Sequence, residues 1–234
     1  MDINDLGQIE ILEGTFSLIF VIISLIIGIL FLLKYFNNKQ IEFVTIGLTW
    51  VFLSSGWWGS AFSFLSILLF NKPLDLFQYL FISNVFLPLV LIVWIYSFCH
   101  TIYPNLEKPG LIITLLIVIP FEIILIVLIF TNPQSVGRFE GTFNVVSSTF
   151  LLVFEISLII TTLITGLIFS IKSMKVDDPT VKWRGRLLLI AFILLTIAGL
   201  ADSFIIGNPL LLVLMRLVLI SSSFIYYLAF FFRR

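Results

Sequence analysis

TFSLIFVIISLIIGILFLLKYF, residues 15–36, is typical of a membrane-spanning helix, because Lys34 is its only charged side chain. A helix over this range would be about 33 Å long, close to the roughly 30 Å hydrocarbon core of a bilayer. Similar apolar runs recur along the chain, separated by short hydrophilic breaks. We therefore predict an all-α fold, a single bundle of seven transmembrane helices over residues 15–36, 42–70, 75–100, 109–131, 144–171, 183–207 and 209–232.

Composition excludes several classes of protein. Of the 234 residues, 60% are hydrophobic and 11% are charged, whereas soluble domains carry about 25% charged residues. A soluble enzyme, a nucleic-acid-binding protein and a disordered chain are therefore excluded. The single cysteine, Cys99, allows no internal disulfide, and with the single histidine, His100, it is too little for a zinc site. We expect no metal and no cofactor.

The basic residues predict the orientation in the membrane, because cytoplasmic loops are enriched in lysine and arginine. Ten of the 13 basic residues fall on one side of the predicted spans, and Lys72 and Arg138 fall on the other. We predict a cell-membrane protein with its N-terminus outside and its C-terminus in the cytoplasm. The first fourteen residues are acidic and lack the positive charge of a signal peptide, so we expect the first helix to remain as an anchor. The ten residues are Lys34, Lys39, Lys108, Lys172, Lys175, Lys182, Arg184, Arg186, Arg233 and Arg234.

The helices are not expected to be straight. The second span, residues 42–70, would be about 43 Å long, which exceeds the bilayer core. We expect it to bend or tilt, with residues 54–60, SSGWWGS, as the place for a bend. Pro88 and Pro120 are further positions for kinks. Residues 132–143 and 172–182 are the longest breaks between spans. Within the second break, Asp178 and Pro179 predict the N-cap and the first turn of the sixth helix.

Two opposite charges fall at matching depth in the last two spans. Asp202 lies about 8 Å and Arg216 about 11 Å from the same predicted membrane surface. An isolated charge in the membrane is costly, so an Asp202–Arg216 ion pair is expected. The pair is either a structural clamp or a latch that a ligand or a proton opens.

Two glutamates also fall at matching depth. Glu122 and Glu155 lie about 14 Å and 17 Å from the same surface, and Asn84 lies near their level. If the carboxyl groups are close together, they suit a proton relay, a cation site or a pH sensor. The alternative is that each glutamate hydrogen-bonds a neighbouring helix, where Pro120 frees a backbone carbonyl.

Two further groups of residues are candidates for binding. Trp57 and Trp58 lie too deep in their span for the interfacial belt, so they either line an apolar ligand pocket or fill space beside glycines. A basic cluster on the cytoplasmic side either contacts anionic lipid headgroups or docks a cytoplasmic partner. It consists of Lys172, Lys175, Lys182, Arg184 and Arg186.

Catalytic motifs are missing. A retinal Schiff base needs a lysine within the last span, which has none. A serine nucleophile such as Ser60 needs a nearby base, but His100 is predicted at the opposite membrane surface. Asp202 is the one aspartate in a span, and an intramembrane aspartyl protease needs two. We expect a protein that is not an enzyme.

Two stretches resemble the seven-helix membrane sensor region at the N-terminus of archaeal and bacterial histidine kinases. The first contains Trp50, Leu87-Pro88, Trp94-Ile95-Tyr96 and Ile102-Tyr103-Pro104. The second contains Ala198-Gly199-Leu200-Ala201-Asp202, Asn208-Pro209-Leu210, Arg216-Leu217 and Ser221-Ser222-Ser223-Phe224-Ile225-Tyr226-Tyr227. In that family the last helix continues into a kinase, which this sequence lacks. The resemblance therefore implies an orphan sensor that acts through a separate partner.

Three functions remain open at this stage. The first is a receptor-like sensor in the lipid bilayer, whose stimulus is an apolar molecule, a proton or the state of the membrane. The second is a small proton or cation transporter that uses Glu122 and Glu155. The third is a non-catalytic subunit of a larger membrane complex. Transport ranks below sensing because few polar residues continue the path on the cytoplasmic side of the glutamates.

Overall fold

The computed structural model describes residues 3–204 and 208–231. Within these ranges, seven helical segments are long and apolar enough to cross a membrane, so the chain has the character of a multi-pass membrane protein. The α-helices are α1 (Gln8–Asn38), α2 (Ile41–Ser54), α3 (Trp58–Phe70), α4 (Leu76–Asn84), α5 (Leu89–Ile102), α6 (Glu107–Thr131), α7 (Thr149–Lys175), α8 (Pro179–Phe204) and α9 (Pro209–Phe231). Short 3-10 turns cover Ile3–Asp5, Ser55–Trp57, Pro104–Leu106 and Pro133–Ser135.

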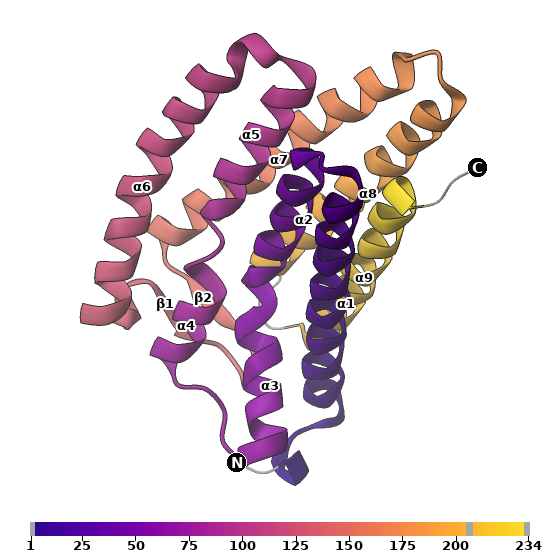
Figure 1. Cartoon of the computed structure of the whole chain (residues 1–234). Helices are drawn as coiled ribbons and strands as arrows, with labels where there is room; N and C mark the ends of the chain where they lie inside the picture. Colours follow the sequence, from indigo (N-terminus) through magenta and orange to yellow (C-terminus); the bar gives the residue numbers. More distant parts are fainter. Residues whose placement is uncertain (1–2, 205–207, 232–234) are drawn as a thin grey trace.

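The segments run alternately up and down, which gives the bundle two distinct ends (Figure 1). The N-terminus and the hairpin of β1 (Gly137–Phe139) and β2 (Val145–Ser147) lie at one end, which we call the hairpin end. The connections between α5 and α6 and between α7 and α8 lie at the opposite end. Helix α8 packs along both α7 and α9, and α1 packs along α2 and α9.

Two of the seven segments are interrupted within the bundle. The second is divided into α2 and α3 by the 3-10 turn Ser55–Trp57, inside the stretch where the sequence predicts a bend. The third is divided into α4 and α5 by residues 85–88, which end in Pro88. A proline restricts the backbone of the residue before it and so favours a break here. Pro120, in contrast, lies within an uninterrupted α6.

The hairpin corrects one prediction. Residue 144 was expected to begin a span directly after the break over residues 132–143, but the two strands pair antiparallel with Gly137 opposite Ser147. The β-branched pair Val145-Val146 favours a strand. Helix α7 therefore begins at Thr149, where the Ser148 hydroxyl accepts a hydrogen bond from the Leu151 amide.

The helix ends differ from the predicted spans elsewhere too. Helix α1 begins at Gln8, so Glu13 lies in the helix and is buried, not in an external acidic tail. Helix α8, in contrast, begins at Pro179 as the sequence predicts, because the Asp178 carboxylate caps it by accepting a hydrogen bond from the Thr180 amide and thereby has a lowered pKa. Residues 205–207 and 232–234, including Arg233 and Arg234, lie outside the described residues.

The half of the bundle toward the opposite end has an aromatic core. Trp50 of α2 stacks on Tyr226 of α9 with ring centroids 4.1 Å apart, and Tyr226 also contacts Phe192 of α8. Phe31 of α1 meets Phe230 of α9 at 5.1 Å. We call this layer the aromatic plug: Phe31, Trp50, Trp94, Phe192, Tyr226 and Phe230, each in ring contact with at least one other.

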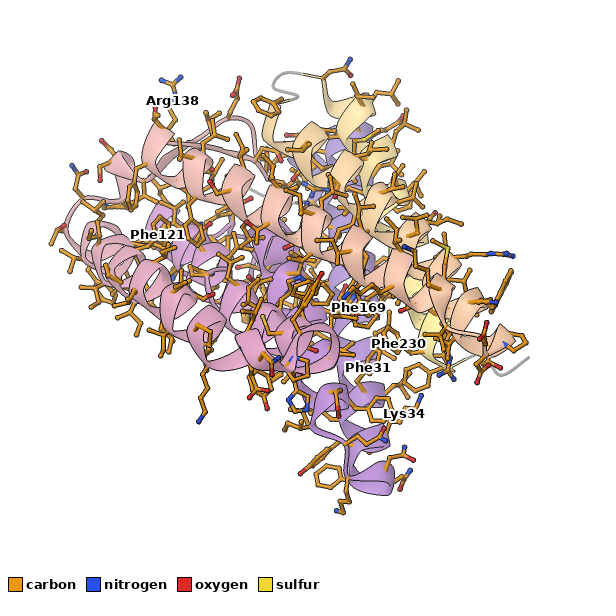
Figure 2. All side chains as sticks on the ribbon, turned by 90° about the horizontal axis from the view of Figure 1, so that it is seen from above. Phe31, Lys34, Phe121, Arg138, Phe169 and Phe230 are labelled. Atoms are coloured by element: carbon orange, nitrogen blue, oxygen red, sulfur yellow. The ribbon has the colours of Figure 1, made fainter. Side chains whose placement is uncertain are left out.

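Lys34 ties the end of α9 to α1. Its ammonium group donates a 2.7 Å hydrogen bond to the carbonyl of Phe230 and lies 4.7 Å from the ring centres of Phe43 and Phe231. Figure 2 shows Lys34 close to Phe31 and Phe230, and far from Arg138 on the hairpin. A cation at a helix C-terminus is favourable, because the last carbonyl groups carry partial negative charge. This contact holds the last turn of α9 against the bundle.

Close packing of α1 against α2 depends on glycine. A Cβ atom on Gly47 would lie 2.7 Å from Phe31 Cβ, and one on Gly28 would lie 2.2 Å from Val51 Cγ2. Small residues allow membrane helices to approach closely. The position of Phe31, and with it the aromatic plug, follows from this approach.

We predict that Gly47→Leu lowers the free energy of unfolding by about 2 kcal/mol or more, because the added side chain overlaps Phe31. Thermal unfolding in detergent measures the loss. Gly56→Ala is the matched control, since a Cβ there meets only Leu87 Cδ1 at 4.0 Å. A Gly47→Leu variant that unfolds at the wild-type temperature would contradict this packing.

Candidate functional site

A buried ion pair joins the last two helices. Arg216 of α9 is 1% exposed, and its Nη1 lies 3.1 Å from Oδ2 of Asp202 on α8. The indole Nε1 of Trp57 donates a 2.8 Å hydrogen bond to the same oxygen. The guanidinium carbon also lies 5.8 Å from the Trp57 ring centre. The pair predicted from matching depth is therefore present, and Trp57 is its third member.

The local structure explains how these three side chains meet. Helices α8 and α9 are consecutive and antiparallel, so residues equally far from their connection lie at the same level. The 3-10 turn Ser55–Trp57 interrupts the second segment where the Trp57 ring reaches the pair. Two polar atoms of the pair, Asp202 Oδ1 and Arg216 Nε, are buried without a hydrogen-bond partner in the described part of the chain.

A cavity of about 270 Å³ lies beside the ion pair, in the half of the bundle toward the hairpin end. Its walls come from the second segment near Trp57, from α4, from the hairpin and from α7, α8 and α9. Glu140 and Phe204 line it and are exposed, so they mark its rim. Asp202 and Arg216 both contribute to its wall.

The structure separates Glu122 and Glu155, so of the two alternatives the shared site does not hold. Glu155 of α7 lines the cavity and accepts a 3.2 Å hydrogen bond from the Ser147 hydroxyl. Glu122 of α6 is not among the lining residues. Helices α6 and α7 meet at this level through Phe121 and Phe154, whose rings stack at 3.7 Å. The stacked rings occupy the helix contact, so the neighbouring glutamates do not share a site.

Of the other predicted intramembrane residues, Asn84 and Trp57 line the cavity and Trp58 does not. Asn84 lines the cavity, and its amide donates to the Leu80 carbonyl. Trp57 lines the cavity, but Trp58 does not: its indole donates to the Ser54 hydroxyl and its ring packs against Phe86. Adjacent residues on a helix point about 100° apart, and here the contacts with Ser54 and Phe86 turn the Trp58 ring away from the cavity.

Two buried hydroxyl groups hold the turn of the hairpin in place through hydrogen bonds. Ser60 and Tyr79 both donate to the carbonyl oxygen of Phe143, at 2.7 Å and 2.9 Å, and contact each other at 2.8 Å. The Phe143 ring packs on Phe64 of α3. The sequence did not predict these hydrogen bonds, because their acceptor is a backbone carbonyl group and the side-chain pattern does not indicate where that group lies.

The sequence also did not predict that Glu13 is buried. It is 3% exposed and lies beside Asn144 of the hairpin. The acidic composition of the first fourteen residues indicated an external tail and hid its burial. The small residues Gly14 and Ser17, which continue the buried face of α1, were the available signal that the helix begins earlier.

The predicted basic cluster lies at the opposite end, where α7 ends and α8 begins. Lys172 stands 3.8 Å from the Tyr103 ring centre, and Lys182 pairs with the exposed Asp177 at 3.7 Å. Arg186 is exposed, whereas Arg184 is half-buried. These charges surround the connection between the helices, as expected for a surface that meets headgroups or a partner. The remaining member of the cluster is Lys175, which is exposed.

His100 forms a second polar cluster at the same end. Its Nδ1 lies 2.7 Å from Glu107 and its Nε2 lies 3.5 Å from Glu42, so it bridges the starts of α2 and α6. Tyr96 stacks on the imidazole. Within the described ranges, no group of three or more histidine, cysteine, aspartate or glutamate side chains is arranged to hold a metal ion.

Comparisons with known proteins return nothing: no family model, no curated protein and no solved structure matches this chain.

We predict that Asp202→Asn and Arg216→Gln each lower the free energy of unfolding by roughly 3 kcal/mol, because each leaves a buried partner unpaired. The double variant should lose less than the sum of the two single losses, since it leaves no unpaired charge. Denaturant titration in mixed micelles measures all four proteins of this double-mutant cycle. Additive losses would contradict a direct pair.

Proposed function

We propose that this protein is a seven-helix membrane sensor and that the cavity beside Asp202 and Arg216 receives the stimulus. The observation that carries the proposal is the position of the ion pair. It forms part of the wall of an open cavity, and it also joins the two last helices. A ligand that changes the contacts of Asp202 would therefore change the packing of α9 against α8.

The aromatic plug favours sensing over transport. Trp50 lies about 10 Å beyond Trp57 along the second segment, and Tyr226 lies about 15 Å beyond Arg216 along α9. Their stacked rings close the bundle on the side of the cavity away from the hairpin. An ion leaving the cavity in that direction would enter a layer of packed rings, where an uncompensated charge is costly.

The orientation and the partner belong to the same proposal. With the lysine-rich end in the cytoplasm, the cavity faces the outside and the end of α9 faces the inside. Lys34 holds that end of α9 against α1, so release or rotation of α9 would change the cytoplasmic surface. A separate cytoplasmic signalling protein would detect this change at a surface that includes the basic cluster.

We predict that opening the ion pair moves α9 at the opposite end. Spin labels at Asn37→Cys on α1 and Leu228→Cys on α9, with the buried Cys99 replaced by serine, report the distance between the two helices. Asp202→Asn should shift the measured distance distribution. Asp177→Asn, the same change at an exposed carboxylate, is the matched control and should leave it unchanged.

A flux measurement separates sensing from transport. Proteoliposomes under an imposed potential should show no proton or potassium flux above empty vesicles. Flux that Glu155→Gln abolishes and Glu122→Gln retains would replace the sensor with a transporter. Unchanged label distances in Asp202→Asn, in a variant that remains folded, would also reject the sensor.

A further inference from the structure

Building on the proposal that the cavity is the stimulus site, we propose that it binds a small organic ammonium ion with an apolar body. The charge of the cavity wall is the first argument. Three carboxyl groups line it, those of Glu140, Glu155 and Asp202, against one basic side chain among the described lining residues, Arg216. Arg216 is already paired with Asp202. Glu155, whose hydrogen bond comes from the neutral Ser147 hydroxyl, therefore has no cation of its own in the wall.

A cationic ligand would supply the missing partner. A carboxylate in apolar surroundings is costly unless it is paired. The oxygen atoms of Ser147 and Asn84 lie in the same wall and can accept further hydrogen bonds from an ammonium group. The aromatic rings of Trp57 and Tyr79 line the cavity as well, and aromatic faces attract organic cations.

An anionic ligand does not fit this wall. Among the described lining residues the basic group is that of Arg216, which is 1% exposed and already paired with Asp202, so it offers little surface to an anion. An anion would instead meet the carboxyl groups of Glu155 and Glu140. The electrostatics therefore select for positive charge.

The size of the cavity and the spread of its acids favour an organic cation over a metal ion. A volume of about 270 Å³ is many times the roughly 10–15 Å³ that holds a single water molecule. The carboxyl groups come from different elements and do not converge as a metal site requires. Much of the wall is aliphatic, which suits an apolar ligand body. Leu53, Leu80, Leu87, Leu152, Leu158 and Leu212 supply this part.

Titration calorimetry on the full chain in detergent tests the inference with three probes of one shape. They are 2-phenylethylammonium, neutral 2-phenylethanol and anionic 3-phenylpropanoate. We expect the ammonium to bind most tightly, and Glu155→Gln to weaken it about tenfold or more, the worth of a charge-assisted hydrogen bond. Glu122→Gln is the matched control, because it changes a glutamate at the same level outside the cavity and should bind like the wild type.

A second variant tests the same cavity in case the Glu155→Gln variant does not fold. Gly56 lines the cavity and has open space beside it, so Gly56→Val should reduce ammonium binding by occupying volume without removing charge. Equal binding of the three probes, or equal affinities in the Glu155→Gln and Glu122→Gln variants, would overturn the inference. So would undiminished binding in Gly56→Val.

The same titration distinguishes two sources of the ammonium group. In phosphatidylglycerol vesicles, whose headgroup carries no ammonium group, added phosphatidylethanolamine that competes with the probe identifies a lipid headgroup as the ligand. Absence of competition identifies a free amine, and both results retain ammonium recognition. If ammonium binding depends on Glu155 but the spin-label distance is unchanged in Asp202→Asn, the proposed sensor function is rejected and the ammonium site is retained. A distance shift in Asp202→Asn without ammonium binding would overturn this inference alone.

Discussion

Arg216 carries a buried positive charge around which the neighbouring helices are arranged. A guanidinium group does not lose its proton in a protein, so a position that is 1% exposed must surround it with compensating groups. Asp202 supplies the opposite charge and Trp57 supplies a donor to the same carboxylate. This requirement fixes the register of α8 against α9. It also places the 3-10 turn of the second segment beside them and leaves a polar wall from which a cavity can open.

The bundle is divided into two halves with different chemistry. Toward the hairpin end, carboxyl, hydroxyl and amide groups surround the cavity. Toward the opposite end, Trp50, Tyr226 and their ring partners fill the same axis. Helix α9 runs through both halves, from Arg216 to the carbonyl that Lys34 holds. Helix α9 thus connects the cavity to the opposite end of the bundle.

The hairpin forms one side of the cavity wall. Hydroxyl groups of Ser60 and Tyr79 hold it through the Phe143 carbonyl, and Thr142 adds a hydrogen bond to Glu10 of α1. Ser147 at its far strand reaches Glu155. The hairpin therefore forms one side of the cavity, and its Ser147 hydroxyl belongs to the polar part of the wall.

Hydropathy along the chain was enough to predict seven apolar segments and their approximate positions, because hydropathy over about twenty residues depends only on composition. The sequence also predicted the Asp202–Arg216 pair, because consecutive antiparallel helices bring equal depths together. Hydropathy could not predict that Glu155 lines the cavity while Glu122 does not, since the rotation of each helix is set by packing such as the Phe121–Phe154 stack. Glu13 and the Phe143 carbonyl likewise join the site through contacts between segments distant in the chain, and the order of the residues carries no record of those contacts.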